Sequence, residues 1–222
     1  MPSGFAQLPD KTSWRALLLQ RRREVPAALR SSESHQLAAG AAAAGELIDG
    51  GGAHTVCAYV PIRNEPGSLA MLDALRAAGH DVLLPIVPTS HSPTGPGPCP
   101  TGPCPTGPCP GALGWARYLG ADSLVTRPGG PREPTGPDLG PAAISEARLV
   151  LVPALAVDRR GVRLGRGAGW YDRTLPLARP GIALLAVVRD DEVVDALPHE
   201  PHDVLMTGVL TPRGGLRALP LT

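Results

Sequence analysis

The segment Val152–Asp172, VPALAVDRRGVRLGRGAGWYD, constrains the fold of this chain most strongly. The apolar stretch Leu149–Leu155 begins three residues before this segment and continues into it. It is too short for an independent helix and predicts a buried strand. A loop should follow, with a helix from about Gly169. In this loop flexible positions alternate with guanidinium groups, at Arg163, Gly165, Arg166, Gly167 and Gly169.

Such a loop suits an anion. Glycine allows positive φ and close approach of the backbone to a ligand, and the first amides of a helix lack intrahelical partners. Two arginines add charge and paired donors, which favours phosphate over a neutral ligand. The alternative is a tight surface turn in a chain that is rich in glycine and arginine.

The order of a strand, an acidic residue, a basic glycine loop and an aromatic helix start resembles the signature segment of the 5-formyltetrahydrofolate cyclo-ligase family (methenyltetrahydrofolate synthetases). The matching positions are Pro153, Asp158, Gly161, Arg163, Leu164, Gly165, Gly167, Gly169, Trp170, Tyr171 and Asp172. The resemblance extends over nearly the whole chain, although only Arg163–Asp172 is highly specific by itself. It implies ATP- and magnesium-dependent conversion of 5-formyltetrahydrofolate to 5,10-methenyltetrahydrofolate, with release of ADP and phosphate.

Charge and hydropathy exclude some partners. The 222 residues carry 21 basic and 20 acidic side chains, so a net charge of +1 gives no argument for nucleic acid or an anionic membrane. No apolar run has the length of a membrane span, and the N-terminus lacks the layout of a secretory signal. We therefore expect a cytoplasmic protein. The four cysteines do not form a disulfide framework pattern.

The first helix is expected over Lys11–Glu24, with Asp10 as its N-cap and Pro26 beyond its end. Lys11 is the only lysine in the chain, and Arg15 lies four residues later on the same helix face. These two cations could be a solvated face. In the cyclo-ligase family, however, a Lys-x-x-x-Arg pair at this place reaches nucleotide phosphates, and the match favours that role.

Three further arginines, Arg21–Arg23, are interpreted as a solvated basic face, with contact to an acidic folate tail as the alternative. Ser31 or Ser32 is expected to cap a second helix that runs to Ile48.

A buried strand is expected over Thr55–Val60, followed by a helix over 67–79 and a strand over 81–87. The loop after the first strand contains Glu65, which by itself could be an ordinary loop carboxylate. The resemblance implies that Glu65 holds the pteridine amino face, with backbone near Val60.

The composition changes at residues 88–111, where Thr-Gly-Pro-Cys-Pro repeats with no aliphatic content. This stretch is expected to be a low-complexity surface insertion. The family's aromatic residue before its Pro-Glu-Pro segment is missing near Gly129, and Trp115, on a strand expected over 114–118, is a candidate replacement.

Near the C-terminus, the segment around Asp203 resembles a family motif whose Asp helps to hold magnesium. The family often repeats an Asp four residues later, where this chain has Thr207. His199 and His202 are interpreted as a loop residue and a packing residue, because magnesium prefers oxygen ligands.

Alternating strands and helices predict an α/β fold, a three-layer α/β/α sandwich with a mainly parallel, Rossmann-like sheet, in one domain spanning 1–222. A helix over 170–178 and a strand over 182–188 complete the pattern. Right-handed crossovers should bring the strand ends after Val60, Leu155 and Val188 to one edge of the sheet.

The resemblance, taken residue by residue, implies the following site. Catalytic roles fall on Lys11 and Arg166. ATP contacts fall on Lys11, Arg15, Arg163, Leu164, Gly165, Arg166, Gly167, Ala168, Gly169, Trp170 and Tyr171. Substrate contacts fall on Val60, Glu65 and Tyr171, and magnesium ligands are Asp172 and Asp203. The implied partner is the small molecule 5-formyltetrahydrofolate, and a monomer is expected.

Two alternatives of other classes stay open. One is a phosphosugar isomerase-like domain that binds a sugar phosphate at the same loop without ATP. The other is a non-catalytic folate- or nucleotide-binding domain, in which the Pro/Cys stretch is an interaction module.

Overall fold

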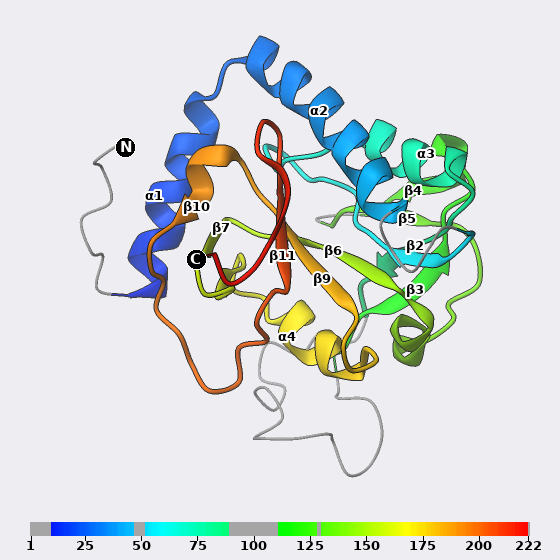
Figure 1. The fold of residues 1–222 in the computed structure, drawn as a ribbon. Helices are drawn as coiled ribbons and strands as arrows, with labels where there is room; N and C mark the ends of the chain where they lie inside the picture. Colours follow the sequence, from blue (N-terminus) through cyan, green and yellow to red (C-terminus); the bar gives the residue numbers. More distant parts are fainter. Residues whose placement is uncertain (1–9, 47–51, 89–110, 128–129, 222) are drawn as a thin grey trace.

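The computed structural model describes residues 10–46, 52–88, 111–127 and 130–221 (Figure 1). Almost all of the stretch interpreted as an insertion, and Gly129 with its missing aromatic, lie outside these residues. Within them, no helix is long and apolar enough to cross a membrane.

A seven-stranded sheet runs through the molecule in the order β12-β11-β9-β6-β1-β2-β3. From one edge to the other, these strands are Gly215–Ala218, Gly208–Thr211, Ala183–Val187, Leu149–Pro153, Thr55–Cys57, Asp81–Ile86 and Gly114–Arg117. The interior pairs are parallel, and only the edge strands β3 and β12 pair antiparallel. The mainly parallel sheet expected from the sequence is confirmed.

Helices cover both faces of this sheet, which gives the three layers. One face packs against α2 (Ala27–Glu46) and α3 (Leu69–Ala77), which contact each other. The other face carries short helices, η2 (Pro141–Glu146), α4 (Trp170–Thr174) and η3 (Leu175–Leu177). Figure 1 shows α2 and α3 on one side of the strands and α4 on the other.

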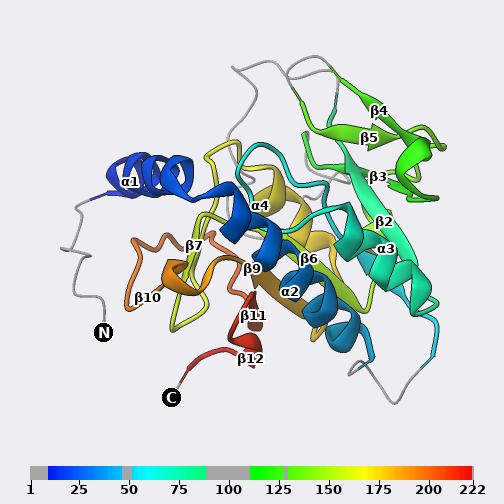
Figure 2. The same cartoon turned by 90° about the horizontal axis from the view of Figure 1, so that it is seen from above.

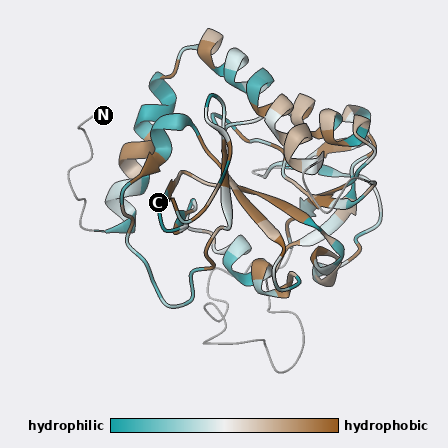
Figure 3. Ribbon diagram, viewed as in Figure 1, coloured by the Kyte–Doolittle hydropathy of each residue, from teal (hydrophilic) through white to brown (hydrophobic). Residues whose placement is uncertain are grey.

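Alternation along the strands builds the two cores, as expected for residues that face opposite sides of a pleated sheet. In β6, Leu151 packs in the cluster under α2 and α3, whereas Val150 and Val152 pack in the cluster under η2 and η3. All three side chains are fully buried. Figure 3 shows the central strands as hydrophobic.

A second, three-stranded sheet corrects the expectation of a continuous loop after residue 155. It has the order β10-β7-β8, formed by Val193–Val194, Ala156–Asp158 and Arg163–Leu164. Helix α1 packs on it through Trp14 and Leu18, in a cluster separate from the main cores. Figure 2 shows α1 beside β7 and β10 at one end of the molecule.

Helix α1 spans Lys11–Glu24, and the Asp10 carboxylate accepts from the amides of Thr12 and Ser13, as predicted. The start expected for the second helix was wrong. Helix α2 begins at Ala27, because the Pro26 carbonyl already accepts from the Arg30 amide at 3.1 Å, and Ser31 and Ser32 lie inside the helix.

A short hairpin flanks the β3 edge of the sheet. It pairs β4 (Leu124–Thr126) with β5 (Arg132–Pro134), after η1 (Ala121–Ser123). It is tied to β2 by the buried Glu133, which accepts from the Val87 amide at 2.9 Å. The hairpin therefore packs against the carboxyl end of β2, outside the main sheet.

Candidate functional site

A cavity of about 1180 Å³ opens at the carboxyl ends of β6, β1 and β2. Open parallel sheets place ligands at this edge. The cavity also takes walls from the start of α1, the loop after β8 and the segment before β11. Every residue assigned to the site from the sequence lines it: Lys11, Arg15, Val60, Glu65, Arg163, Leu164, Gly165, Arg166, Gly167, Ala168, Gly169, Trp170, Tyr171, Asp172 and Asp203.

Asp158 shapes the turn that delivers β8 to this cavity. Its fully buried carboxylate accepts from the amides of Arg160, Val162 and Leu197 at 2.9–3.1 Å, and from the Arg160 guanidinium at 2.6–2.9 Å. These donors compensate the cost of burying the charge. Asp158 matches the family pattern, and its contacts show a structural role in holding the β7–β8 turn.

The loop after β8 depends on glycine at two turns. Gly167 has φ 102° and Gly169 has φ 70°, both in the region that favours glycine. Gly169 is the N-cap of α4, and because it has no side chain it leaves the first amides of this helix uncapped. Arg173 braces the loop by donating to the carbonyls of Ala168 and Gly111 at 3.0 and 3.1 Å.

The start of α1 meets the other walls through its two predicted cations. The Lys11 ammonium lies 2.9 Å from the Asp203 carboxylate and 3.2 Å from that of Glu200. Arg15 donates from Nε to the Gly165 carbonyl at 3.0 Å. One helical face therefore touches both the glycine loop and the segment before β11.

Two more arginines, Arg163 of β8 and Arg166 of the loop after it, are also held by carboxylates. Arg166 donates from Nε to Glu65 Oε1 at 2.7 Å, and the other Glu65 oxygen accepts from the Ile62 amide at 3.0 Å. Arg163 donates to Asp172 at 2.5 Å, and its guanidinium carbon lies 5.7 Å from the centre of the Tyr171 ring. The structure thus joins the basic loop to the loop that carries Glu65.

The ionisable groups of the site respond to this environment. Burial opposes ionisation of Asp203, but the Glu200 amide and the Lys11 ammonium outweigh it and hold the pKa of this carboxyl below its ordinary value. Burial, with the charge of Glu65, raises the pKa of the Tyr171 hydroxyl well above its ordinary value. The raised pKa keeps this buried hydroxyl a neutral phenol, and it has no hydrogen-bond partner in the described structure.

The structure also locates four further residues that the sequence analysis singled out. Trp115 is fully buried in the core under the sheet and does not replace the missing aromatic as a wall of the cavity. Thr207 accepts from the Leu184 amide at 2.8 Å at the amino end of β11, away from the cavity. His199 is an exposed loop residue outside the cavity lining, as expected. The packing role expected for His202 was wrong, because its side chain is exposed, lines the cavity and pairs with Glu200 at 3.3 Å.

Two carboxylates of the cavity could hold a metal ion. In the described part of the chain, no three His, Cys, Asp or Glu residues are grouped to hold an ion. Asp172 and Asp203 both line the cavity, and both offer oxygen ligands. Magnesium commonly takes one or two carboxylates together with substrate phosphates and water, so this donor set suits an ion that arrives with a phosphate ligand.

Sequence reasoning missed Arg22, which was interpreted as solvated. Arg22 is 2% exposed and donates to both oxygens of the buried Glu192 at 2.6 and 2.7 Å. Burial disfavours its charge, but Glu192 outweighs this and raises the pKa of Arg22. Its spacing of eleven from Lys11, about three helical turns, is the signal that places both on one face.

Comparisons of the sequence with a family model and with known proteins indicate the same family. A family model described as "5-formyltetrahydrofolate cyclo-ligase family" matches residues 7–212. A 5-formyltetrahydrofolate cyclo-ligase of Mycolicibacterium smegmatis is 47% identical over 210 residues, which cover 95% of this chain and 97% of the relative. The enzyme of the same name from Escherichia coli K12 is 26% identical over 165 residues, covering 72% and 79%.

Solved structures show the same fold. A 5,10-methenyltetrahydrofolate synthetase of Aquifex aeolicus superposes with a TM-score of 0.67 at 21% identity, covering 96% of this chain and 94% of that one. A 5,10-methenyltetrahydrofolate synthetase of Mycoplasma pneumoniae gives a TM-score of 0.64 at 17% identity, covering 90% and 97%.

Proposed function

Because this chain belongs to the 5-formyltetrahydrofolate cyclo-ligase family and has its enzymatic activity, we propose that it closes the folate ring with ATP and magnesium in the cavity described above. The product is 5,10-methenyltetrahydrofolate, with ADP and phosphate released. One observation supports this most directly. The glycine loop with its cations and the Glu65 carboxylate face the same cavity and touch each other through Arg166.

The reaction needs a better leaving group on the formyl carbon. The formyl oxygen attacks the γ-phosphorus as the bond to ADP breaks. N10 then attacks the formyl carbon and loses its proton, and the C–O bond breaks to release phosphate. No side-chain nucleophile is required, so the task of the protein is to position two ligands and neutralise charge.

The phosphate end is assigned to Lys11, Arg15, Arg163 and Arg166, with backbone amides from Gly165 to Tyr171. Lys11, Arg163 and Arg166 contact carboxylates, and Arg15 contacts a carbonyl. A triphosphate offers these cations stronger acceptors, because charge-assisted hydrogen bonds to phosphate are short and often bidentate. Lys11 and Arg166 carry the catalytic role, since transferred charge develops on the γ-phosphoryl oxygens.

The folate end is assigned to Glu65, the backbone near Val60, and Tyr171. A carboxylate can accept two donors from a 2-amino-4-oxo heterocycle, which matches the buried side chain of Glu65 (8% exposed). Tyr171 is assigned to the folate because it lines the same cavity as Glu65 and its hydroxyl has no hydrogen-bond partner in the described structure.

Magnesium, brought with the nucleotide, would be held by Asp172 and Asp203 and would offset phosphate charge. Both carboxylates contact cations of the same site, Arg163 and Lys11. Those cations would turn to the phosphates as the carboxylates turn to the ion. We also propose that the protein acts as a monomer in the cytoplasm.

The test is ADP release by the purified chain with 5-formyltetrahydrofolate, ATP and magnesium, against reactions that lack one component. We expect ADP and 5,10-methenyltetrahydrofolate in equal amounts, the latter measured by its absorbance, and no product without ATP or magnesium. Turnover of a ribose phosphate in place of the folate would support the isomerase alternative. Tight folate binding without turnover would support the non-catalytic alternative.

A further inference from the structure

Arg22 lies at a junction of three elements that the proposed reaction needs in register. Its guanidinium donates to Glu192 of η4 (Asp190–Glu192) and to the Ala154 carbonyl just after β6, the latter at 2.6 Å. Its own backbone carbonyl accepts from the Asn64 side chain at 2.9 Å. Arg22 therefore links α1 to η4, to the carboxyl end of β6 and to the loop before α3.

The three contacts join the two ends of the cavity. On α1, Lys11 and Arg15 precede Arg22 by eleven and seven residues, so all three lie on about the same helical face. On the folate side, Asn64 is the neighbour of Glu65. The distance between the cations of α1 and the Glu65 carboxylate therefore depends on the contacts of Arg22.

The phosphate end of α1 has anchors of its own. Lys11 is held by Asp203 and Glu200, and Arg15 by the Gly165 carbonyl. Losing the contacts of Arg22 would leave these anchors in place while freeing the opposite end of the helix from the sheet and from the Asn64 loop.

We propose that the buried Arg22–Glu192 ion pair is a positioning device, which sets the nucleotide-binding face of α1 relative to the Glu65 loop so that the γ-phosphate meets the formyl oxygen. This inference rests on the proposed function. Both side chains are nearly inaccessible, 2% for Arg22 and 4% for Glu192, so neither touches the substrates. Their effect is exerted through α1 and the Asn64 contact.

Stability alone is a poor explanation for such a pair. A buried ion pair often contributes no more than apolar residues of similar volume, because removing two charges from water is costly. What a planar guanidinium adds is direction, since it holds the carboxylate with two parallel bonds while another N–H meets the Ala154 carbonyl. Three fixed donors define one orientation of the helix end.

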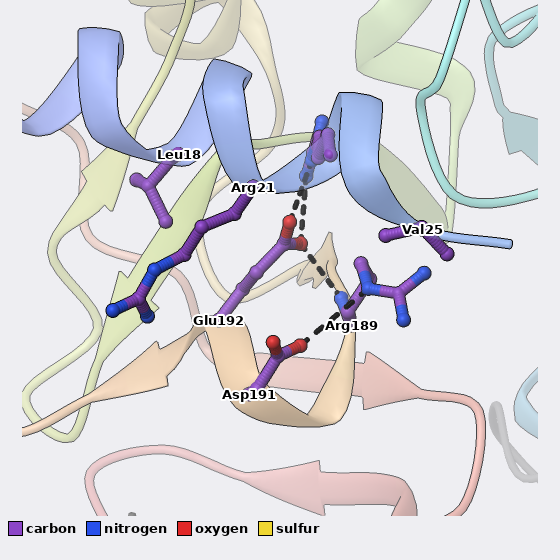
Figure 4. A pocket seen from close by; sticks show the side chains of 7 residues that line it. Leu18, Arg21, Val25, Arg189, Asp191 and Glu192 are labelled. Carbon is purple, nitrogen blue, oxygen red and sulfur yellow. Dashed lines mark hydrogen bonds and ion pairs between the residues drawn. The ribbon is translucent and has the colours of Figure 1, made fainter. Parts of the chain in front are cut away.

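The small cavity at this junction is not a second ligand site. It has about 20 Å³ of space, enough for a single water, and is lined by Leu18, Arg21, Arg22, Val25, Arg189, Asp191 and Glu192. Figure 4 shows Glu192 extending toward α1 between Arg21 and Arg189. Arg22 Nη1 has no hydrogen-bond partner within the described structure, and one water would satisfy it.

The test combines kinetics with binding in the double variant Arg22→Met/Glu192→Gln. The glutamine keeps a side-chain oxygen for the Arg189 amide, from which Glu192 accepts at 2.8 Å. We expect a folded protein by circular dichroism, with kcat lowered about tenfold to a hundredfold, the cost of a misplacement on the order of 1 Å. Dissociation constants for a non-hydrolysable ATP analogue and for 5-formyltetrahydrofolate, each by calorimetry, should stay within about twofold of wild type.

Two further variants accompany it. Arg23→Met changes the adjacent arginine, which is exposed and lies outside the cavity, and should keep the wild-type kcat. Asn64→Ala leaves the ion pair intact and removes one contact of the junction. It should lower kcat by about twofold to tenfold, the value of one hydrogen bond.

The outcomes separate clearly. A folded double variant with the wild-type kcat overturns the inference, and so does a loss confined to nucleotide affinity. If the double variant does not fold, Asn64→Ala decides alone: a lowered kcat with unchanged dissociation constants supports the inference, and an unchanged kcat overturns it. Absence of folate-dependent ADP release by the wild-type protein contradicts the proposed function itself, and the inference with it.

Discussion

Arg166 donates to Glu65 across 2.7 Å, although 101 residues separate them in the sequence. Each Glu65 oxygen then accepts one hydrogen bond, since the other oxygen accepts from the Ile62 amide. In the proposed function Arg166 serves the phosphates and Glu65 serves the pterin. A nucleotide that draws Arg166 away would therefore free Glu65 for the folate, and the two ligands would favour each other's binding.

Replacing Glu65 by glutamine should weaken 5-formyltetrahydrofolate binding by about 1.5–3 kcal/mol, because a charged acceptor is lost. The affinity for a non-hydrolysable ATP analogue should be equal to the wild-type value or higher, because Arg166 loses its competing carboxylate. Calorimetry with each ligand alone measures both effects. Glu24→Gln, an exposed change on α1, is the control, and equal losses for the two ligands would contradict the pterin assignment.

Replacing Lys11 by arginine should lower kcat/KM for ATP about tenfold, although the charge is kept. The ammonium fits between Asp203 and Glu200 at 2.9 and 3.2 Å and is 17% exposed, so a longer planar group cannot take the same place. Steady-state kinetics at varied ATP measures the effect. Arg23→Lys serves as a matched exchange on the exposed side of the same helix, and kinetics like those of wild type would remove the special role of Lys11.

Alanine at Gly161 should destabilise the protein by about 3 kcal/mol or more. Gly161 has φ 98°, and an added Cβ would lie 2.5 Å from the backbone carbonyl of Met206. The control is Gly79→Ala, where φ is 89° but an added Cβ has no heavy atom within 4 Å, so only backbone strain of about 1–2 kcal/mol remains. Chemical denaturation compares the two, and equal losses would show that the Met206 contact is relieved.

The stability difference between the wild-type protein and Asp203→Asn should shrink on acidification. The pKa of Asp203 is held below 3.8 in the folded protein, so the unfolded chain takes up the proton first. The stabilisation from this carboxylate is complete above about pH 5 and is lost as the pH falls through the folded pKa. Melting temperatures from about pH 7 to about pH 3 measure this, and a constant difference would contradict it.

Local signals in the sequence predicted much of the fold. Asp10 was identified as an N-cap because a carboxylate before an amphipathic stretch satisfies free amides of the first turn. Strand β6 was predicted from an uninterrupted aliphatic run. The start of α2 was misplaced because a serine has the same capping hydroxyl inside a helix as before one, so Ser31 and Ser32 did not mark the true start. The helix begins earlier, where the Pro26 carbonyl accepts from the Arg30 amide.

The amino-acid sequence by itself determined which residue types lie at the ends of the elements. These are the glycines and arginines in and after β8, Glu65 in the loop after β1, and the paired cations of α1. It also determined the alternation of elements that makes a parallel sheet. Both are short-range properties, because they depend on residues within a few positions of each other.

Tertiary structure alone decided which charges are buried and which partners they meet. Arg22 and Arg23 are neighbours of identical type, yet one is 2% exposed against Glu192, 170 residues away, and the other faces solvent. Arg166 meets Glu65 because the loop after β8 lies at the carboxyl ends of the parallel strands β6 and β1, in the cavity that both residues line. The energy of an ion pair depends on the distance between the charges in space. Local propensity determines the helices and strands, but only their packing sets these distances.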